Sequence, residues 1–388
     1  MDFKTAGESH GKGLVGIISN YPSGVPIKNT YIDYQLARRQ KGYGRGGRMA
    51  IESDKVEIIS GVRKGLSTGS PISFIIHNKD WVNWKDTMDP NLPGLPADKE
   101  EILSDPRPGH ADLPGIIKYR LGTIRDVIER SSARETAAKV CVGSFARVVL
   151  DYLGIEIFSY VNRIGNIFID SDLDLDDKDM QEKIESSEVR CPDKEVSEKM
   201  KAEIDRVKKT GDSIGGSFKI IVCGAVIGLG SFTDWDKRLD ARLSYAIMGI
   251  PAIKAIEIGQ GIKAGSATGL NFHDEIYYSK NNGFYRKTNN AGGIEGGMTN
   301  GEDIIIGAVM KPIPTTTKGM KTVNIPTKDE AVSIKERSDT CAVPSAAVVG
   351  EAVVAIELLN SIQEKFGSDT LDEIKINLDN YKKYIKNL

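Results

Sequence analysis

Loops with the composition of functional segments, several of them rich in glycine, are spread from residue 7 to residue 345, and apolar segments fill the intervals between them. Glycine accounts for 40 of the 388 residues, whereas the average share is about 7%. No Ser/Gly-rich or Pro-rich linker separates the loops, although a prior of about 150 residues per domain would admit two or three domains. The chain is therefore predicted to be one large domain, residues 1–388, whose loops converge on a cleft.

The apolar segments show the patterns of both strands and helices. Strands are predicted over residues 13–20, 55–60, 71–77, 155–169, 216–229, 253–258 and 303–310. Helices are predicted over residues 29–40, 113–130, 132–153, 175–209, 236–248, 346–365 and 370–386, the first of them capped by Asn29 or Thr30. Residues 80–105 contain several prolines and no clear period, so we expect a long, ordered and functional loop there.

The composition excludes several classes of protein. Hydrophobic residues make up 40% and charged residues 27%, as in ordinary soluble globular proteins. No run of 18 apolar residues marks a membrane helix, and the first residues lack the apolar stretch of a secretory signal. The 4 cysteines form no C-x-x-C pair, which favours free thiols in a reducing cytoplasm. There is no zinc motif, G-x-S-x-G, Walker motif or dinucleotide fingerprint, and no metal is expected.

Charge is distributed unevenly, although the net charge is only −2. Residues 38–48 contain five basic residues and no acid, and glycines frame Arg45 and Arg48. Because arginine binds phosphate and carboxylate through paired hydrogen bonds, this segment favours a phosphorylated ligand. The alternatives are a solvated charge run and a short RNA-binding segment, and the near-neutral chain argues against nucleic acid. Residues 170–198 contain twelve acids and four bases, and we interpret them as a solvated outer helical region.

Two of the 4 histidines lie in loops of small residues, His10 within residues 7–11 and His110 within residues 107–112. Histidine exchanges protons near neutral pH, and flanking glycines let a ligand approach its ring. The alternative is a histidine in a tight turn that hydrogen-bonds to a neighbour. His77 and His273 lie in or after strand-like segments, where a structural role is expected.

The sequence Ser132-Ala133-Arg134-Glu135 has the form of a capping box and predicts a helix that starts at Ser132. The free N–H groups of a helix start, beside Arg130 and Arg134, would bind an anion, and a purely structural cap is the alternative. Residues 130–132 and 337–339 both precede helices of small apolar residues, which admits a duplicated βα architecture. Residues 289–297 form a further glycine-rich loop, and residues 311–317 a rigid run with a lysine and hydroxyls.

Taken in order, these motifs resemble those of the chorismate synthases over essentially the whole chain. The three signatures are GESHG at residues 7–11, RSSARETA at 130–137, and RSD at 337–339 followed by PSA at 344–346 and GEA at 350–352. Supporting matches are GYGRGGRM at 42–49, RPGHAD at 107–112, NNAGGIEGG at 289–297 and KPIPT at 311–315. Each piece is weakly specific alone, but their combination in this order is very specific.

The resemblance implies an α+β protein with the β-α-β sandwich of this family, assembled as a homotetramer. It implies a lyase that converts 5-enolpyruvylshikimate 3-phosphate into chorismate in the shikimate pathway of aromatic amino acid biosynthesis. Phosphate leaves carbon 3 and hydrogen leaves carbon 6 in an anti-1,4-elimination, and reduced FMN is required although nothing is oxidised overall. The chain has no appended reductase domain, which favours a separate flavin reductase, although NADPH is the reductant in some family members.

The resemblance also assigns residues to ligands. FMN contacts are expected at Ser132, Ala133, Arg134, Pro251, Ala252, Gly296, Lys311, Pro312, Ile313, Pro314, Thr315 and Arg337. Substrate or NADPH contacts are expected at Arg39, Arg45, Arg48 and Arg107, with Arg39 and Arg45 at the NADPH positions. Pro251 departs from the family pattern because glutamine is expected there, so a contact through a side-chain amide would be lost while a backbone contact would survive.

A mechanism follows as a hypothesis. His10 would donate a proton to the departing phosphate, His110 would stabilise reduced flavin as a monoanion, and Asp339 would assist proton removal at carbon 6 through flavin N5. Two other classes remain open at this point. A flavin- or NADPH-dependent oxidoreductase would consume NADPH in step with product, and an RNA-binding module would show a steep salt dependence without any need for flavin.

Overall fold

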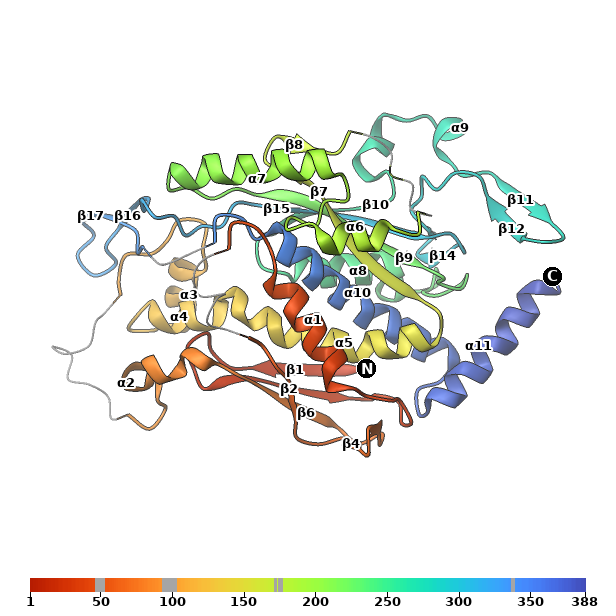
Figure 1. Cartoon of the computed structure of the whole chain (residues 1–388), viewed down its shortest axis with the longest axis horizontal. Coiled ribbons are helices and arrows are strands. Elements are labelled where there is room, and N and C mark those ends of the chain that lie inside the picture. The colour runs from red at the N-terminus through yellow and green to blue at the C-terminus, as the bar shows by residue number, and fades with distance from the viewer. Residues whose placement is uncertain (46–52, 93–102, 171–172, 174–176, 336–338) are drawn as a thin grey trace.

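Two antiparallel sheets lie on either side of a layer of long helices in the computed structural model (Figure 1). The structure describes residues 1–45, 53–92, 103–170, 173, 177–335 and 339–388. Each sheet has an apolar face that must be covered, and the central helices cover both. The architecture is the mixed α+β sandwich that the resemblance implied.

The first sheet is small and has one face open to solvent. Its strand order is β1 (Asp2–Ala6), β2 (Gly13–Ser19), β6 (Ile72–His77) and β3 (Glu57–Ile58). Burial alternates along β2, where Leu14 and Ile18 are buried while Val15 and Ile17 are exposed. This period of two is expected for an antiparallel sheet that packs on the core through one face.

The second sheet packs on helices through both faces. Its order is β10 (Ile253–Ile258), β15 (Ile304–Met310), β9 (Gly216–Cys223), β7 (Glu156–Ile164) and β8 (Ile167–Phe168). One face contacts α8 (Leu239–Met248) and α10 (Val343–Phe366). On the other, Met180 and Ile184 of α6 (Met180–Ser186) pack against Phe158 and Ile221.

The acidic region is therefore more than a solvated surface. The charged side chains that the structure describes in this region mostly face solvent, but α6 covers part of the sheet, and Glu185 pairs with Arg38 at 2.6 Å and Arg190 at 2.7 Å. The interpretation of residues 170–198 as an outer region was incomplete, because a count of charges does not show which acids point inward.

The central layer contains α1 (Asn29–Gln40), α5 (Thr136–Tyr152) and α10. Helices α5 and α10 cross closely, since a Cβ atom added to Gly143 would lie 2.5 Å from the Cβ of Ala352. Helix α10 is long and apolar enough to span a membrane, but 89% of its most apolar window is buried inside the fold. It is the core helix of the sandwich, and α11 (Leu371–Lys386) packs against it.

The remaining elements are short or peripheral. The other helices are α2 (Lys85–Met88), α3 (Asp112–Tyr119), α4 (Arg125–Ser131), α7 (Lys194–Lys209) and α9 (Gly269–Phe272). The 3₁₀ turns are η2 (Lys79–Asn83), η3 (Ala133–Glu135), η4 (Trp235–Lys237) and η5 (Gly261–Ser266). The two-stranded pairs are β4 (Val62–Arg63) with β5 (Leu66–Ser67), β11 (Ile276–Ser279) with β12 (Gly283–Arg286), β13 (Ile294–Glu295) with β14 (Met298–Thr299), and β16 (Lys321–Val323) with β17 (Glu330–Val332).

Several predicted boundaries were wrong for local reasons. The single helix expected over residues 113–130 is α3 and α4, because Arg120 adopts a left-handed φ of 55° between them. The loop expected over residues 80–105 contains η2 and α2. Neither Asn29 nor Thr30 caps α1, which starts at Asn29 with no side-chain cap. Ser132 does cap a helical turn, but that turn is η3, and α5 begins at Thr136.

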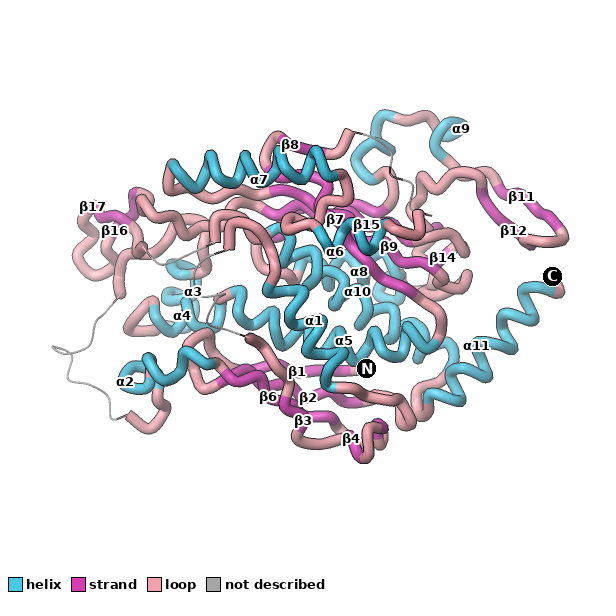
Figure 2. The backbone as a smooth tube through the Cα atoms, in the orientation of Figure 1, coloured by secondary structure: helices cyan, strands magenta, loops and turns pink. Residues whose placement is uncertain are grey.

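Loops gather at the end of the molecule that lies opposite α11, around α3, α4, β16 and β17 (Figure 2). Helices α5 and α10 pack against each other in the central layer. This agrees with the similarity between residues 130–132 and 337–339, each of which precedes one of these helices. The two sheets differ in size, however, and the internal duplication stays a prediction.

Candidate active site

The first and second signature motifs lie against each other. The Oγ of Ser9 donates to the Oγ of Ser132 at 3.1 Å, and the backbone N–H of Ser9 donates to the carbonyl of Glu129 at 2.9 Å. The side-chain amide of Asn78 donates to the carbonyls of three residues in the loop, Glu8, Ser9 and Gly11. The loop that carries His10 is therefore fixed to the end of α4 and the cap before α5.

A buried carboxylate and an aromatic ring hold His10. Its Nδ1 lies 2.8 Å from Oε1 of Glu129, and its backbone N–H donates to Oε2 of the same carboxylate at 2.8 Å. The imidazole stacks on Trp84 with a centroid distance of 3.9 Å and an interplanar angle of 25°. Burial raises the pKa of Glu129, but the hydrogen bonds and charge of His10 outweigh this effect and lower it.

Arg39 and Arg134 converge on one carboxylate. Nη1 of Arg134 lies 2.6 Å from Asp54, and Nη2 of Arg39 lies 3.1 Å from the other oxygen of Asp54. Burial, together with the nearby charges of Arg45 and Arg134, lowers the pKa of Arg39 to about 10, although Asp54 opposes the shift. In the described part of the chain, Nε of Arg39 and Nη2 of Arg134 have no hydrogen-bond partner. The cluster thus has a surplus of positive charge and buried donors that suit an anion.

A second cluster joins the loops after α1 and before α10. Nη1 of Arg45 pairs with Oδ2 of Asp339 at 3.1 Å, and the N–H of Thr340 donates to the carbonyl of Gly44 at 2.8 Å. The neighbouring thiol of Cys341 is buried, which raises its pKa to about 12, so it is not a nucleophile near neutral pH. The predicted ligand residues Arg48 and Arg337 lie outside the described residues.

A third cluster surrounds His110. Its Nδ1 lies 2.5 Å from Oδ1 of Asp112, whose other oxygen accepts a hydrogen bond from Nε of Arg107 at 2.8 Å. Burial would raise the pKa of Asp112, but hydrogen bonds from His110 and Arg107 outweigh it and place that pKa far below its usual range. Nη1 of Arg107 donates to Thr315 at 3.0 Å, and Nζ of Lys311 donates to the carbonyl of Gly109. The motif at 107–112 therefore meets the run at 311–315.

The FMN residues that the resemblance assigns around Pro251 lie beside this run. Strand pairing places Ile253 opposite Met310, and the N–H of Lys311 donates to the carbonyl of Ala252 at 3.0 Å. Ala252 has a φ of 69°, an uncommon conformation for a residue with a side chain. Nζ of Lys139 in α5 reaches the carbonyl of Gly249 at 3.1 Å, which links this turn to the helix that follows Arg134.

Gly296 lies elsewhere. The carbonyl of Gly297 accepts from the N–H of Leu239 at the start of α8, whereas Gly249 follows the end of that helix. Helix rise places these two ends about 15 Å apart. Gly296 and Pro251 can contact one ligand within a single chain only if that ligand extends along α8.

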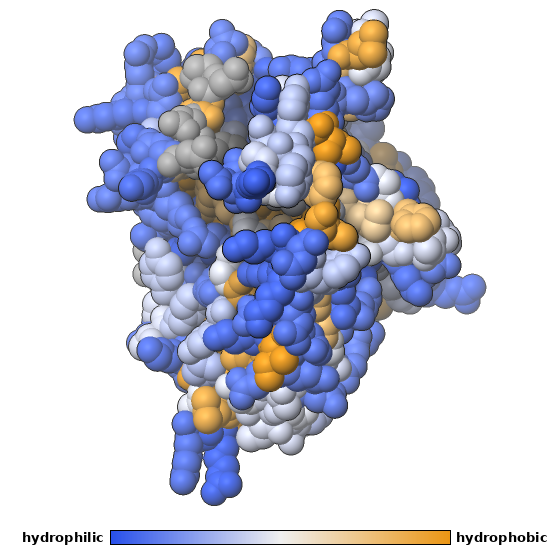
Figure 3. All heavy atoms as spheres, turned by 90° about the vertical axis from the view of Figure 1, so that its right-hand side faces the viewer, coloured by the Kyte–Doolittle hydropathy of each residue, from blue (hydrophilic) through white to orange (hydrophobic). Residues whose placement is uncertain are grey.

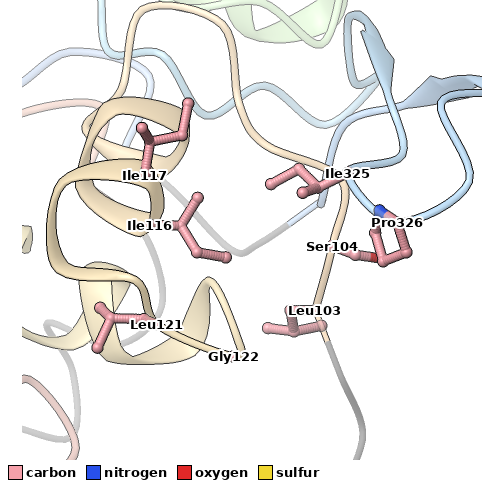
Figure 4. A pocket seen from close by; sticks show the side chains of 8 residues that line it. All are labelled: Leu103, Ser104, Ile116, Ile117, Leu121, Gly122, Ile325 and Pro326. Atoms are coloured by element: carbon pink, nitrogen blue, oxygen red, sulfur yellow. The ribbon is translucent and has the colours of Figure 1, made fainter.

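Helices α3 and α4 carry the carboxylates that hold both histidines, Asp112 at the start of α3 and Glu129 near the end of α4. Their buried side chains Ile116, Ile124 and Ile128 form a hydrophobic cluster that is separate from the main core. A pocket of about 200 Å³ opens beside it, and apolar side chains from α3 and from residues 103 and 325 point toward one another across it (Figure 4). No predicted site residue lines this pocket, so the convergence of the loops on an open cleft stays a prediction.

Sequence reasoning missed Asp54, Trp84, Asp112 and Glu129. A spacing of three residues between Trp81 and Trp84 was a helical signal inside a segment that was interpreted as a loop. Nothing in the local sequence indicates that Asp54 would lie between Arg39 and Arg134, because their contact depends on tertiary packing.

The residues present fit an anionic cofactor that carries a phosphate. Two buried guanidinium groups have unsatisfied donors, and Lys311, Thr315 and Ser132 add ammonium and hydroxyl groups. A Cβ added to Gly296 would meet nothing within 4 Å, so space for a ligand exists there as well. Among the described residues, no three His, Cys, Asp or Glu side chains are grouped as metal ligands.

The fold is an α+β sandwich, and its candidate site holds two histidines on buried carboxylates beside buried guanidinium groups that suit an anion. The family model described as chorismate synthase matches residues 1–362. The chain is 51% identical over 386 residues to chorismate synthase of Desulforamulus reducens, covering 100% of this chain and 99% of the relative. It is 49% identical over 393 residues to that of Geobacter sulfurreducens, covering 100% of this chain and 99% of the relative.

A solved structure titled "Crystal Structure of Chorismate Synthase" is similar at a TM-score of 0.79, with 38% identity and coverage of 100% of this chain and 98% of that chain. The chain belongs to the chorismate synthase family and functions as a phosphate-eliminating lyase of the shikimate pathway. This confirms the function and fold that the resemblance implied, in place of the RNA-binding module and the net oxidoreductase.

Proposed function

We propose that this chain converts 5-enolpyruvylshikimate 3-phosphate into chorismate in a reaction that requires reduced FMN. The reaction would take place at the site formed by His10, by His110 and by the arginines around Asp54 and Asp339. The observation that carries the proposal is the presence of two histidines, His10 and His110, each held by a buried carboxylate near a group of arginines. The substrate has two carboxylates and a phosphate, which match the positive surplus around Arg39 and Arg134.

The arginines bind and orient the substrate anions. Arg39, Arg45, Arg107 and Arg134, with Arg48 and Arg337, would hold the phosphate and the carboxylates or the phosphate of the cofactor. Phosphate is a poor leaving group unless its negative charge is neutralised. His10 therefore donates a proton to the departing phosphate, and the guanidinium groups neutralise its remaining charge. Asp339, which faces Arg45, receives the proton that leaves carbon 6.

The FMN site is assigned to the residues that the resemblance indicates. Ser132, Ala133 and Arg134, residues 251–252, Gly296, residues 311–315 and Arg337 would hold FMN. When bound, reduced FMN would supply electron density to the allylic carbon of the substrate. His110, whose Nδ1 lies against Asp112 and whose Nε2 lies 3.4 Å from Nη2 of Arg107, would hold a proton near the negatively charged edge of the flavin.

The source of electrons is proposed to be a separate flavin reductase. The similarity to a chorismate synthase covers 100% of this chain, which supports a separate protein as the source of electrons. The alternative is that Arg39 and Arg45 bind NADPH and the chain reduces its own flavin. NADPH added anaerobically with oxidised FMN would leave the absorbance of NADPH unchanged if the reductase is separate.

The enzyme is proposed to act in the cytoplasm as a homotetramer. Large apolar side chains are exposed on one chain, including Phe232, Trp235, Tyr245, Ile262 and Leu270. The end of the molecule that carries the β11–β12 hairpin is mostly hydrophilic with separate apolar groups (Figure 3). Single exposed apolar groups are ordinary on a protein surface, so the tetramer rests on the resemblance, and these side chains are its candidate contacts.

An anaerobic assay with dithionite-reduced FMN tests the site. Replacing His10→Ala or His110→Ala is expected to lower turnover by a factor of about 10²–10⁴, because each removes a proton donor. His77→Ala is the matched control, since His77 is exposed and pairs with Glu57, and its turnover is expected to match that of the unmodified enzyme. Wild-type rates in both variants with saturating FMN would show that neither histidine acts in the reaction.

A further inference from the structure

Both oxygens of the Glu129 carboxylate are used by one residue, His10. One oxygen faces Nδ1 of the ring at 2.8 Å, and the other accepts the backbone N–H at 2.8 Å. The side chain of Glu129 is 1% exposed, and that of His10 is 13% exposed. Water therefore has little room to replace either contact, and the orientation of the ring depends on Glu129.

The contact also selects which ring nitrogen carries a hydrogen. The lowered pKa of Glu129 keeps it ionised near neutral pH, and an ionised carboxylate only accepts hydrogen bonds. Nδ1 of His10 must therefore carry a hydrogen in both the neutral and the charged ring. The nitrogen that can lose its proton is Nε2, which Glu129 does not hold.

Two neighbouring residues act on this pair. Trp84 fixes the plane of the His10 ring, and Arg125 stabilises the negative charge of Glu129. Trp84 stacks on the imidazole, and its own Nε1 donates to Asp80 at 3.1 Å. Nη1 of Arg125 lies 3.3 Å from Glu129 and its guanidinium 5.2 Å from the ring centroid of Trp84. The other charged groups around the loop are Glu8 and Lys12 within or beside it and Arg130, which donates to the carbonyl of Gly7.

We propose that Glu129 is a positioning residue that holds His10 with its hydrogen on Nδ1, so that the proton given to the departing phosphate comes from Nε2. The Nε2–H bond breaks, its electron pair stays on the ring, and an O–H bond forms on the phosphate. The ring becomes neutral and keeps its Nδ1 hydrogen on Glu129. This inference rests on the proposed role of His10 as the acid.

The substitution Glu129→Gln tests the proposal because an amide has only one acceptor oxygen. It can accept either the backbone N–H or Nδ1–H of His10, but not both, and its NH₂ group then faces the other position. If the oxygen stays on the backbone N–H, Nδ1 must become an acceptor and Nε2 carries the hydrogen of the neutral ring. Glu129→Asp keeps two acceptor oxygens on a shorter side chain and serves as the conservative variant.

The first readout does not depend on activity. Long-range ¹H–¹⁵N spectra of histidine-labelled protein at alkaline pH, where the rings are neutral, report which nitrogen carries the hydrogen, and only 4 histidines contribute. The His10 signals are assigned by their loss in His10→Ala. We expect hydrogen on Nδ1 in the unmodified protein and in Glu129→Asp, and a shift toward Nε2 in Glu129→Gln. Hydrogen on Nε2 of His10 in the unmodified protein would overturn the proposal.

The second readout is the anaerobic turnover. Glu129→Gln is expected to lower kcat about 10²-fold or more with a smaller effect on KM, because the acid is lost while the substrate anions are still bound. Glu57→Gln is the matched control, since it removes the carboxylate from the exposed His77 and is expected to leave kcat unchanged. A changed tautomer with unchanged kcat would overturn the role of His10 as the acid and the positioning role with it. A changed tautomer with a lower kcat that Glu129→Asp partly restores would support both.

Discussion

Several of the decisive residues in this chain are carboxylates that neutralise more than one partner. Asp54 serves Arg39 and Arg134, Asp112 serves His110 and Arg107, and Glu129 serves His10 and Arg125. Glu351 in α10 extends this arrangement away from the site. It is 1% exposed and contacts Arg38, Arg147, Arg190 and the hydroxyl of Ser159.

Acid is expected to destabilise the fold through Glu351. Burial opposes ionisation, but the three guanidinium charges outweigh it and lower the pKa to about 2 from a model-compound value of 4.5. A carboxyl with a lowered pKa stabilises the fold above its unfolded pKa and loses that contribution as the pH falls through the folded value. Urea unfolding should therefore show a loss of about 3 kcal/mol between pH 4.5 and pH 2 that depends on Glu351.

Glu351→Gln should remove this dependence and destabilise the protein at neutral pH by about 3–5 kcal/mol, because buried guanidinium groups lose their counter-charge. Glu364→Gln on the same helix is the control. Glu364 is exposed and pairs with Arg242 at the surface, so its loss should change stability by less than about 1 kcal/mol. Equal effects of the two substitutions would contradict the buried network as the source.

At the scale of the elements, the site is built from the ends of core helices. Arg39 lies near the end of α1, Arg134 just before α5, and Asp339 shortly before α10. The close crossing of α5 and α10 at Gly143 brings two of these ends together. A substitution at Gly143 tests whether this crossing stabilises the protein.

Gly143→Ala should destabilise the protein by about 1–3 kcal/mol, because the new methyl would overlap Ala352, although alanine is otherwise the better helix former. The control is Gly265→Ala in η5, where an added Cβ meets nothing within 4 Å. Thermal unfolding of both variants provides the comparison. A more stable Gly143→Ala variant would mean that the helices can separate at this crossing without loss.

The sequence predicted most elements and missed the contacts between them. Residues 253–258 were predicted as a strand with the observed bounds, because a short apolar run between turn signals is strongly patterned. The break at Arg120 was missed because its left-handed conformation leaves no mark in the periodicity. The residues around His10, Arg134 and His110 came from motifs, whereas Asp54 and Glu129 could not, since pairing across more than 75 positions is decided by the fold.

At the scale of the whole molecule, one chain leaves a number of large apolar groups in water. Trp235 is 82% exposed and Leu270 is 99% exposed. Both side chains are expected to be buried between subunits in the homotetramer that we propose.

Trp235→Lys and Leu270→Lys should lower the molar mass measured by light scattering toward that of a smaller assembly, because each puts a charge in an apolar contact. Ile376→Lys on α11 provides a control, as Ile376 is also exposed but lies on the terminal helix. An unchanged mass in both variants would place the subunit contacts on another surface, and a monomeric unmodified protein would contradict the tetramer.

The excess of positive charge around Asp54 would couple ligand binding to folding. One carboxylate faces two buried guanidinium groups whose donors are not all satisfied, and Arg45 adds to the repulsion. An incoming phosphate or carboxylate would act as the missing counter-ion and hold α1 and α5 together as well as enter the reaction. Ligand binding and folding would then draw on the same interaction, so the protein is expected to resist unfolding most strongly when its substrate is bound.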